Sequence, residues 1–136
     1  MASTLATTWA PRFLSLLRLV VGLLFLEHGL AKLAHFPHQA NFDNLKLFSL
    51  LGLAGVIELV GGALVALGLF TRIAAFIMSG EMAVAYFYAH APRNVFPLLN
   101  GGDAAILYCF IFFYLFLAGP GPYALDAVRK PGLAAR

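Results

Sequence analysis

Four long apolar runs, separated by short polar segments, dominate the pattern of hydrophobic positions along the chain. They cover about residues 13–34, 49–70, 73–90 and 103–118. A helix needs about 20 predominantly apolar residues to cross the hydrocarbon core of a bilayer. The pattern therefore predicts an all-α, polytopic membrane protein in which four transmembrane helices form a bundle.

The composition supports membrane insertion. Of the 136 residues, 62% are hydrophobic and 11% are charged, and the mean hydropathy is +0.88. Soluble proteins average roughly 45–50% apolar and about 25% charged residues. Four spans with short connections use the whole chain, so we expect one membrane domain over residues 1–136. The nine Lys and Arg residues are spread singly at span ends and form no patch for nucleic acid.

Short connections join the predicted spans. They are a loop at residues 35–48, a tight turn at Thr71-Arg72 and a proline-containing loop at residues 91–102. Glycine and proline at residues 119–122 end the last helix, because proline removes a backbone donor and clashes with the preceding turn. The first run is longer than the apolar centre of a cleaved secretory signal, so we interpret it as a retained helix.

The basic residues predict the orientation, because cytoplasmic ends of membrane spans carry an excess of Lys and Arg. With the N-terminus inside, the cytoplasmic side carries five of them: Arg12, Arg72, Arg129, Lys130 and Arg136. The outer loops carry Lys46 and Arg93. We therefore expect an inner-membrane protein with both termini in the cytoplasm.

Acidic residues within the apolar runs are the main indication of function. The chain has six acids, and Glu27, Glu58, Glu81 and Asp103 lie in or beside the four runs. Ionisable groups in membrane spans are costly and usually functional. At a rise of about 1.5 Å per residue, the three glutamates share a layer about 10–14 Å below the outer surface. Other polar residues lie in that layer or above it, namely His28, Lys32, His35, His90 and Asn100.

Helical spacing groups these residues into faces. His28, Lys32 and His35 share one face of the first helix. On the third helix, Met82, Tyr86 and His90 form one stripe, and Glu81, Ala85 and Tyr88 form the next. Glu58 belongs to a ridge with Ala54, Gly62 and Ala66, and such small residues let membrane helices approach closely. We therefore expect a polar pocket that opens outward and has walls of Tyr, Phe and Met.

The pocket residues are assigned hypothetical roles. Proton handling falls to Glu27, Glu58 and Glu81. Substrate binding falls to His28, Lys32, Tyr86, His90, Asn100 and Asp103. Three carboxyl groups in one apolar layer cannot all be ionised cheaply, so we expect at least one of them to be protonated near neutral pH. We assign this role to Glu81, because it has no adjacent basic residue.

Other interpretations remain open for the same residues. Glu58 with Lys32 or Arg18 is also consistent with a purely structural ion pair. The chain lacks the paired Glu-x-x-His motifs of di-iron bundles, so no metal site is predicted. The single Cys109 lies within an apolar run and is interpreted as a core thiol.

Several motifs resemble the DoxX family of small membrane proteins. Arg18, Gly22 and residues 25–33 (Phe-Leu-Glu-His-Gly-Leu-Ala-Lys-Leu) are similar to the signature of its first helix. Residues 58–72, from Glu58 through the glycine-rich stretch to Thr71-Arg72, resemble its second helix. Asn100-Gly101-Gly102, Gly119-Pro120-Gly121 and Leu125-Asp126 resemble its last segment. One departure is Ala124, where the family often has serine.

The resemblance implies a four-helix inner-membrane fold that is associated with redox enzymes. We favour a subunit or companion of a quinone-linked oxidoreductase, with a quinone in the outward pocket and a soluble or membrane redox enzyme as partner. The alternatives are a non-catalytic anchor for a soluble redox enzyme and a small proton-coupled transporter. No haem ligand pair, CxxC motif or nucleotide-binding glycine loop is found in the sequence. Self-association into a homo-oligomer is left open.

Overall fold

The computed structural model describes residues 3–129, and the secondary structure in this part of the chain is entirely helical. The predicted positions of Lys130 and Arg136 lie outside the described residues. The helical segments are η1 (Leu5–Trp9), α1 (Ala10–Leu33), η2 (Ala40–Phe42), α2 (Leu50–Leu67), α3 (Thr71–Ala85), η3 (Tyr86–His90), α4 (Pro97–Asn100), α5 (Asp103–Ala118) and α6 (Leu125–Arg129). Each of the four predicted runs therefore contains one long helix.

Two of the described helices are long and apolar enough to cross a membrane. They are Leu5–Leu33, in which η1 extends α1, and Leu50–Leu67. Asp103–Ala118 is a shorter apolar helix. The structure thus supports an all-helical protein with two candidate spans, whereas the sequence predicted four.

Local signals explain where the helices begin and end. The hydroxyl of Ser49 accepts a hydrogen bond from the backbone nitrogen of Gly52 at 3.1 Å and caps the start of α2. Gly68 ends α2 in the left-handed conformation, with φ of 70°. The predicted turn at Thr71-Arg72 is wrong, because both residues already belong to α3 and the turn lies at residues 68–70.

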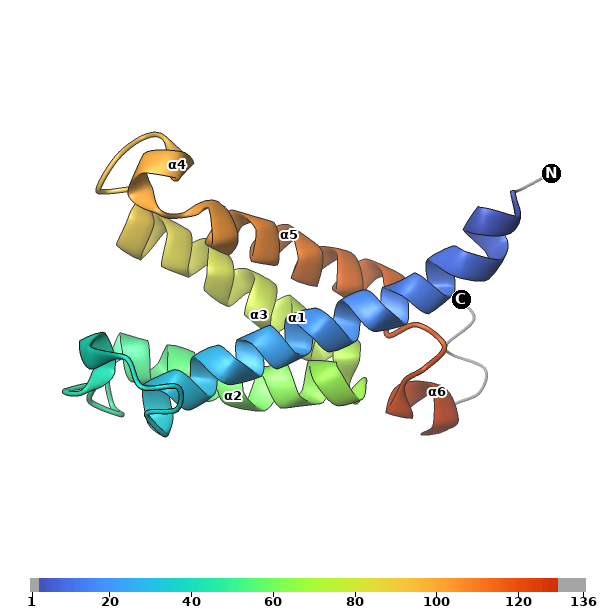
Figure 1. Ribbon diagram of the computed structural model, residues 1–136, viewed down its shortest axis with the longest axis horizontal. Helices are drawn as coiled ribbons and strands as arrows, with labels where there is room; N and C mark the ends of the chain where they lie inside the picture. The colour runs from blue at the N-terminus through green and yellow to red at the C-terminus, as the bar shows by residue number, and fades with distance from the viewer. Residues whose placement is uncertain (1–2, 130–136) are drawn as a thin grey trace.

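The long helices pack as two pairs, α1 against α2 and α3 against α5. Glycines bring the first pair close together: a Cβ atom on Gly62 would lie 2.5 Å from the backbone nitrogen of Leu26, and one on Gly22 would lie 2.5 Å from that of Ala66. The two pairs share a core in which Phe25 packs edge-on against Phe112, with ring centroids 4.6 Å apart. From their connecting turn, α2 and α3 diverge towards the far end of the molecule (Figure 1).

Arg18 lies in the core near the α2–α3 turn, where it makes several hydrogen bonds. Its guanidinium is buried and donates to the carbonyl oxygens of Val65, Ala66, Pro120 and Tyr123 at 2.5–2.8 Å. Arg18 therefore does not pair with Glu58, which was one of the two partners considered. Its hydrogen bonds join the end of α2 to the segment that follows α5.

Candidate functional site

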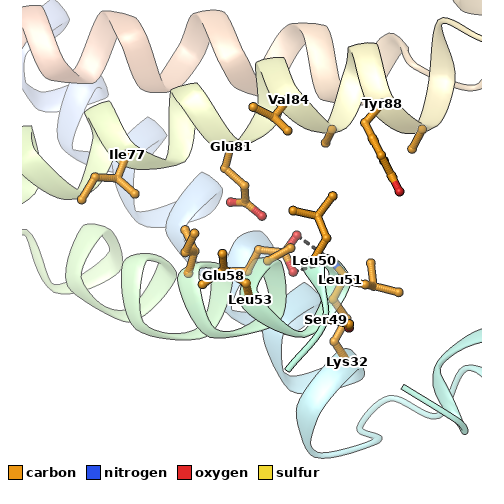
Figure 2. Close-up of a pocket in the computed structure, with 14 residues that line it drawn as sticks. Lys32, Ser49, Leu50, Leu51, Leu53, Glu58, Ile77, Glu81, Val84 and Tyr88 are labelled. Atoms are coloured by element: carbon orange, nitrogen blue, oxygen red, sulfur yellow. Dashed lines mark hydrogen bonds and ion pairs between the residues drawn. The ribbon is translucent and has the colours of Figure 1, made fainter. Parts of the chain in front are cut away.

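A cavity of about 600 Å³ lies between α2 and α3, where the two helices diverge. Figure 2 shows Glu58 and Lys32 on one side of this space and Glu81 on the other. Its lining residues come from α1, α2 and its cap, α3 and η3: Lys32, Ser49, Leu50, Leu51, Leu53, Ala54, Ile57, Glu58, Ile77, Glu81, Val84, Ala85, Tyr88 and Ala89. We call this cavity the α2–α3 pocket.

A closed ion pair lies at the base of the α2–α3 pocket. The ammonium nitrogen of Lys32 donates to both carboxylate oxygens of Glu58, at 2.6 and 2.5 Å, and both side chains are nearly buried. The glycine contacts between α1 and α2 make this pair possible, because a Cβ atom at Gly55 would lie 3.1 Å from Cβ of Lys32. Of the two partners considered for Glu58, the structure therefore selects Lys32.

Phe42 covers the cation of this pair from the loop between α1 and α2. The ammonium nitrogen of Lys32 lies 5.6 Å from the centroid of the Phe42 ring. Phe42 ends the short helix η2 and is half-buried. The ring face attracts the cation and limits the access of water to it.

Glu81 is the unpartnered acid of the pocket. Both of its carboxyl oxygens are buried, and neither has a hydrogen-bond partner among the described residues. Lys32 is occupied by Glu58, so no described cation neutralises Glu81. A buried carboxyl group without a partner is costly as an anion, and such a group is able to donate or accept a proton when a ligand enters.

The pocket walls differ from the prediction of Tyr, Phe and Met. They are mostly aliphatic, and Tyr88 is the aromatic residue among those that line the pocket. Met82 is buried in the shared core instead. Leu53, Val84 and Tyr88 are also exposed on the outer surface of the helices. The pocket therefore opens sideways between α2 and α3 as well as towards the end of the molecule.

Three of the predicted binding residues gather elsewhere. The rings of Tyr86 and His90 are stacked with centroids 6.5 Å apart, and Nδ1 of His90 lies 3.0 Å from the carbonyl oxygen of Asn100. The amide of Asn100 donates to the carbonyl oxygen of Asn94 at 2.9 Å and accepts from the backbone nitrogen of Gly102 at 2.7 Å. This group fastens the loop before α5 to the end of η3, and none of its members lines the α2–α3 pocket.

Glu27, His28 and Asp103 are not brought into the α2–α3 pocket either. Glu27 and His28 are exposed on α1, and Asp103 is exposed at the first residue of α5. The ring of His28 stacks on Phe25 at 5.9 Å, and its Nδ1 lies 2.8 Å from the carbonyl oxygen of Leu24. Of the nine predicted site residues, the pocket therefore contains Lys32, Glu58 and Glu81.

Sequence reasoning missed the aliphatic walls and Phe42. Ile77 and Val84 lie four residues before and three residues after Glu81, so helical spacing alone places them on the same face. Phe42 had no such signal, because its position over Lys32 depends on the path of an irregular loop.

Comparisons with known proteins agree with a membrane protein of this kind. The sequence model of the DoxX family matches residues 13–91, more than half of the chain. A Haemophilus influenzae protein described as uncharacterized is 47% identical over 122 residues, which cover 87% of this chain and 91% of that protein. An uncharacterized membrane protein of Mycobacterium tuberculosis is 31% identical, with 81% of this chain and 77% of that protein covered.

No solved structure matches the chain. The family match includes both helix signatures seen in the sequence, whereas the resemblance at residues 100–126 lies beyond the matched range. The matched length and the identity with the Haemophilus protein lead to one conclusion: the chain is a membrane protein that belongs to the DoxX family.

Proposed function

We propose that the protein is a redox-associated membrane component that binds a quinone in the α2–α3 pocket. The observation that carries the proposal is the unpartnered Glu81 carboxyl group inside an otherwise aliphatic cavity. Pockets for small molecules typically measure about 300–1,000 Å³, with apolar walls and a few placed polar groups. A quinone has this amphipathic character, because its ring carries two carbonyl oxygens and its isoprenoid tail is apolar.

The residues of the pocket suit reduction of such a ring. Conversion of a quinone to a quinol takes two electrons and two protons, and each carbonyl oxygen becomes a hydroxyl group. We assign the electrons to the redox centre of a partner oxidoreductase. Glu81 delivers one proton to the ring oxygen nearest to it and recovers a proton from water at the outer end of the pocket, and water supplies the second proton to the other ring oxygen. The Lys32–Glu58 pair holds the polar base of the site in place.

We further propose that four helical segments span the inner membrane: η1–α1, α2, α3 with η3, and α5. The segment Thr71–His90 has 20 residues without a break, which corresponds to about 30 Å of helix. The start of α1, the α2–α3 turn and α6 lie at one end of the molecule (Figure 1). Arg12, Arg72 and Arg129 are at this end, which supports a cytoplasmic location for it.

Quinone binding is tested by extraction of the protein purified in mild detergent, followed by mass spectrometry. We expect a quinone in the parent protein and its loss from Leu53→Trp, because Leu53 lines the pocket and an indole would fill it. Leu117→Trp is the matched control, since Leu117 is exposed to a similar degree on α5. Equal retention in both variants, or no quinone in the parent after growth in quinone-rich membranes, would contradict the proposal.

The proton role of Glu81 needs a separate measurement. In vesicles that contain the partner enzyme, Glu81→Gln should slow quinol formation at least tenfold and leave the amount of bound quinone similar. Asp43→Asn, the same chemical change in an exposed loop, should have no effect. If Glu81→Gln reduces quinone at the parental rate, the proton comes from elsewhere.

A non-catalytic anchor is the second candidate, and the Lys32–Glu58 pair favours it. Both of these charges are already satisfied within the protein, as a purely structural pair would be. An anchor would retain its soluble partner when the pocket is filled. Capture of the same partner by the parent and by Leu53→Trp, together with the absence of bound quinone, would support this alternative.

A further inference from the structure

The residues that line the α2–α3 pocket include two acids and one base. The ammonium nitrogen of Lys32 donates to both carboxylate oxygens of Glu58. Figure 2 shows the Glu81 carboxyl group pointing from α3 into the space between the helices, towards this pair. Both oxygens of Glu81 are buried and have no hydrogen-bond partner among the described residues. When both acids are ionised, the lining therefore has one negative charge in excess.

The charge balance of the pocket separates three classes of ligand. An anion is repelled by the excess acid, and Lys32 is available to it only if the buried pair breaks. A neutral ligand, such as the quinone proposed above, suits the protonated form of Glu81. A cation suits the ionised form, because a buried charge is stable when it is paired and hydrogen-bonded. The two protonation states of Glu81 therefore suit two different ligand classes, and the second class is cationic.

The lining of the pocket also selects the kind of cation. Quaternary ammonium groups have no N–H donors and are typically held by cages of aromatic rings. Tyr88 is the one aromatic side chain among the described residues that line the pocket, so no such cage is formed. A primary ammonium group has three donors, which can satisfy both unpartnered oxygens of Glu81. The site therefore favours a primary ammonium group.

The walls of the pocket suit an alkyl chain attached to that group. They are mostly aliphatic, and Leu53 and Val84 are each 55% exposed where the pocket opens sideways. This opening lies between α2 and α3, which diverge from their connecting turn (Figure 1). An alkyl chain can lie against the walls and extend through the opening into lipid, where its burial is favourable. The pocket thus fits an amphipathic ligand that enters from the bilayer.

We propose that the α2–α3 pocket binds lipophilic primary ammonium cations at Glu81. When the ammonium group enters, the Glu81 carboxyl group releases its proton to water, and the carboxylate that remains pairs with the cation. The net charge of the pocket is therefore the same before and after binding. The other titratable side chains of the lining are Lys32 and Glu58, which stay paired, and the exposed Tyr88. The inference uses the pocket of the proposed function but does not depend on quinone binding.

Binding of decylammonium to the purified protein in phosphatidylcholine nanodiscs tests the role of Glu81. Equilibrium dialysis should show saturable binding by the parent, in addition to partition into empty nanodiscs. Glu81→Gln should weaken it at least about tenfold, because a charge-assisted hydrogen bond is lost. Glu27→Gln, the same change at an exposed acid outside the pocket, should bind as the parent does. No saturable binding by the parent, or equal affinity in the parent and Glu81→Gln, would overturn the proposal.

A comparison of ligands on the parent protein tests the proposal without any variant. Decanol has the same chain without the charge, and decyltrimethylammonium has the charge without N–H donors. Both should bind at least about tenfold more weakly than decylammonium. Equal affinity for decanol would show that the chain alone binds, and equal affinity for the trimethyl compound would show that no hydrogen bond to Glu81 is made; either result would refute the site.

Proton release gives a further readout of the same binding event. In weakly buffered, slightly acidic solution, decylammonium should release protons from the parent protein and none from Glu81→Gln. Binding to the parent without proton release would refute the exchange at Glu81. These measurements use protein without added quinone, so failure to extract a quinone would contradict the proposed function and leave the ammonium site intact.

Discussion

Gly62 offers the sharpest test of how α1 and α2 are held together, because the chain contains a matched control. A Cβ atom on Gly62 would lie 2.5 Å from the backbone nitrogen of Leu26 and 2.9 Å from the carbonyl oxygen of Gly22. Both contacts are with the backbone of α1, which cannot rotate away. Gly80, in the middle of α3, has nothing within 4 Å of the same built atom.

The expected magnitudes follow from these distances. Normal contacts of a methyl group are about 3.5–4.0 Å, so Gly62→Ala pushes α1 outward by about 1 Å. Overpacking of this kind costs about 1–3 kcal/mol. At Gly80 the same change meets no atom and gains up to about 1 kcal/mol from helix propensity. The two variants should therefore differ by about 1–4 kcal/mol in free energy of unfolding.

Thermal unfolding in one detergent, followed by circular dichroism, provides the assay. At roughly 3 °C per kcal/mol for a chain of this size, Gly62→Ala should melt about 3–12 °C below Gly80→Ala. Gly62→Leu should be lower still, since a longer side chain has no space to enter. If the two alanine variants melt together, the close contact between α1 and α2 is wrong, and with it the approach that positions Lys32 against Glu58.

Three further predictions concern buried charge and orientation. Arg18→Met should lower the free energy of unfolding by about 3 kcal/mol or more, because it leaves buried carbonyl oxygens without donors. Arg12→Met, at an exposed site, should change it by less than about 0.5 kcal/mol. Equal melting temperatures for the two variants would contradict this prediction. Lys32→Met and Glu58→Gln should each lower the free energy of unfolding, and the loss in the double variant should be smaller than the sum of the two single losses by at least about 1 kcal/mol. Strict additivity in a double-mutant cycle would show that the pair is not coupled. In a chain otherwise free of cysteine, Arg129→Cys should resist an impermeant maleimide added to intact cells, and rapid labelling would reverse the orientation.

The positions of the helices could be predicted from the sequence because the signals for them are local. The long apolar runs, Gly68 after α2 and the Gly119-Pro120 break after α5 act on their own backbone. The start of α3 could not be predicted in this way. The carboxylate of Asp126 accepts hydrogen bonds from the backbone nitrogens of Phe70 and Thr71 at 2.9 and 3.0 Å, and this distant cap moves the turn to residues before Thr71.

For the candidate site, the sequence indicated the direction of some side chains but not of others. Glu58 was assigned to the bundle interior because small residues mark its ridge, and Gly62 does pack against α1. Glu27 had no such marker. Its neighbours on α1 are apolar on the core side and on the lipid side alike, so hydrophobic periodicity does not separate the two faces in a membrane helix. The position of Glu27 along α1 could therefore be predicted, but not the face of the helix on which it lies.

Glu81 differs from Glu58 in having no cationic partner among the described residues, because Lys32 is paired with Glu58. The sequence placed Lys32 in or above the layer of the three glutamates and offered Glu58 as its partner. Its ammonium nitrogen lies within 2.6 Å of both carboxylate oxygens of Glu58, and Phe42 covers it from the loop side. Glu81 is then left in the same pocket without a hydrogen-bond donor among the described residues. A hydrogen-bonding group of a ligand could bind the Glu81 carboxyl group without breaking any existing hydrogen bond. To bind Glu58, the ligand would have to break an existing ion pair. We therefore expect a ligand to bind at Glu81 and not at Glu58. Breaking the buried Lys32–Glu58 pair would leave an uncompensated charge, whereas Glu81 has no partner to lose.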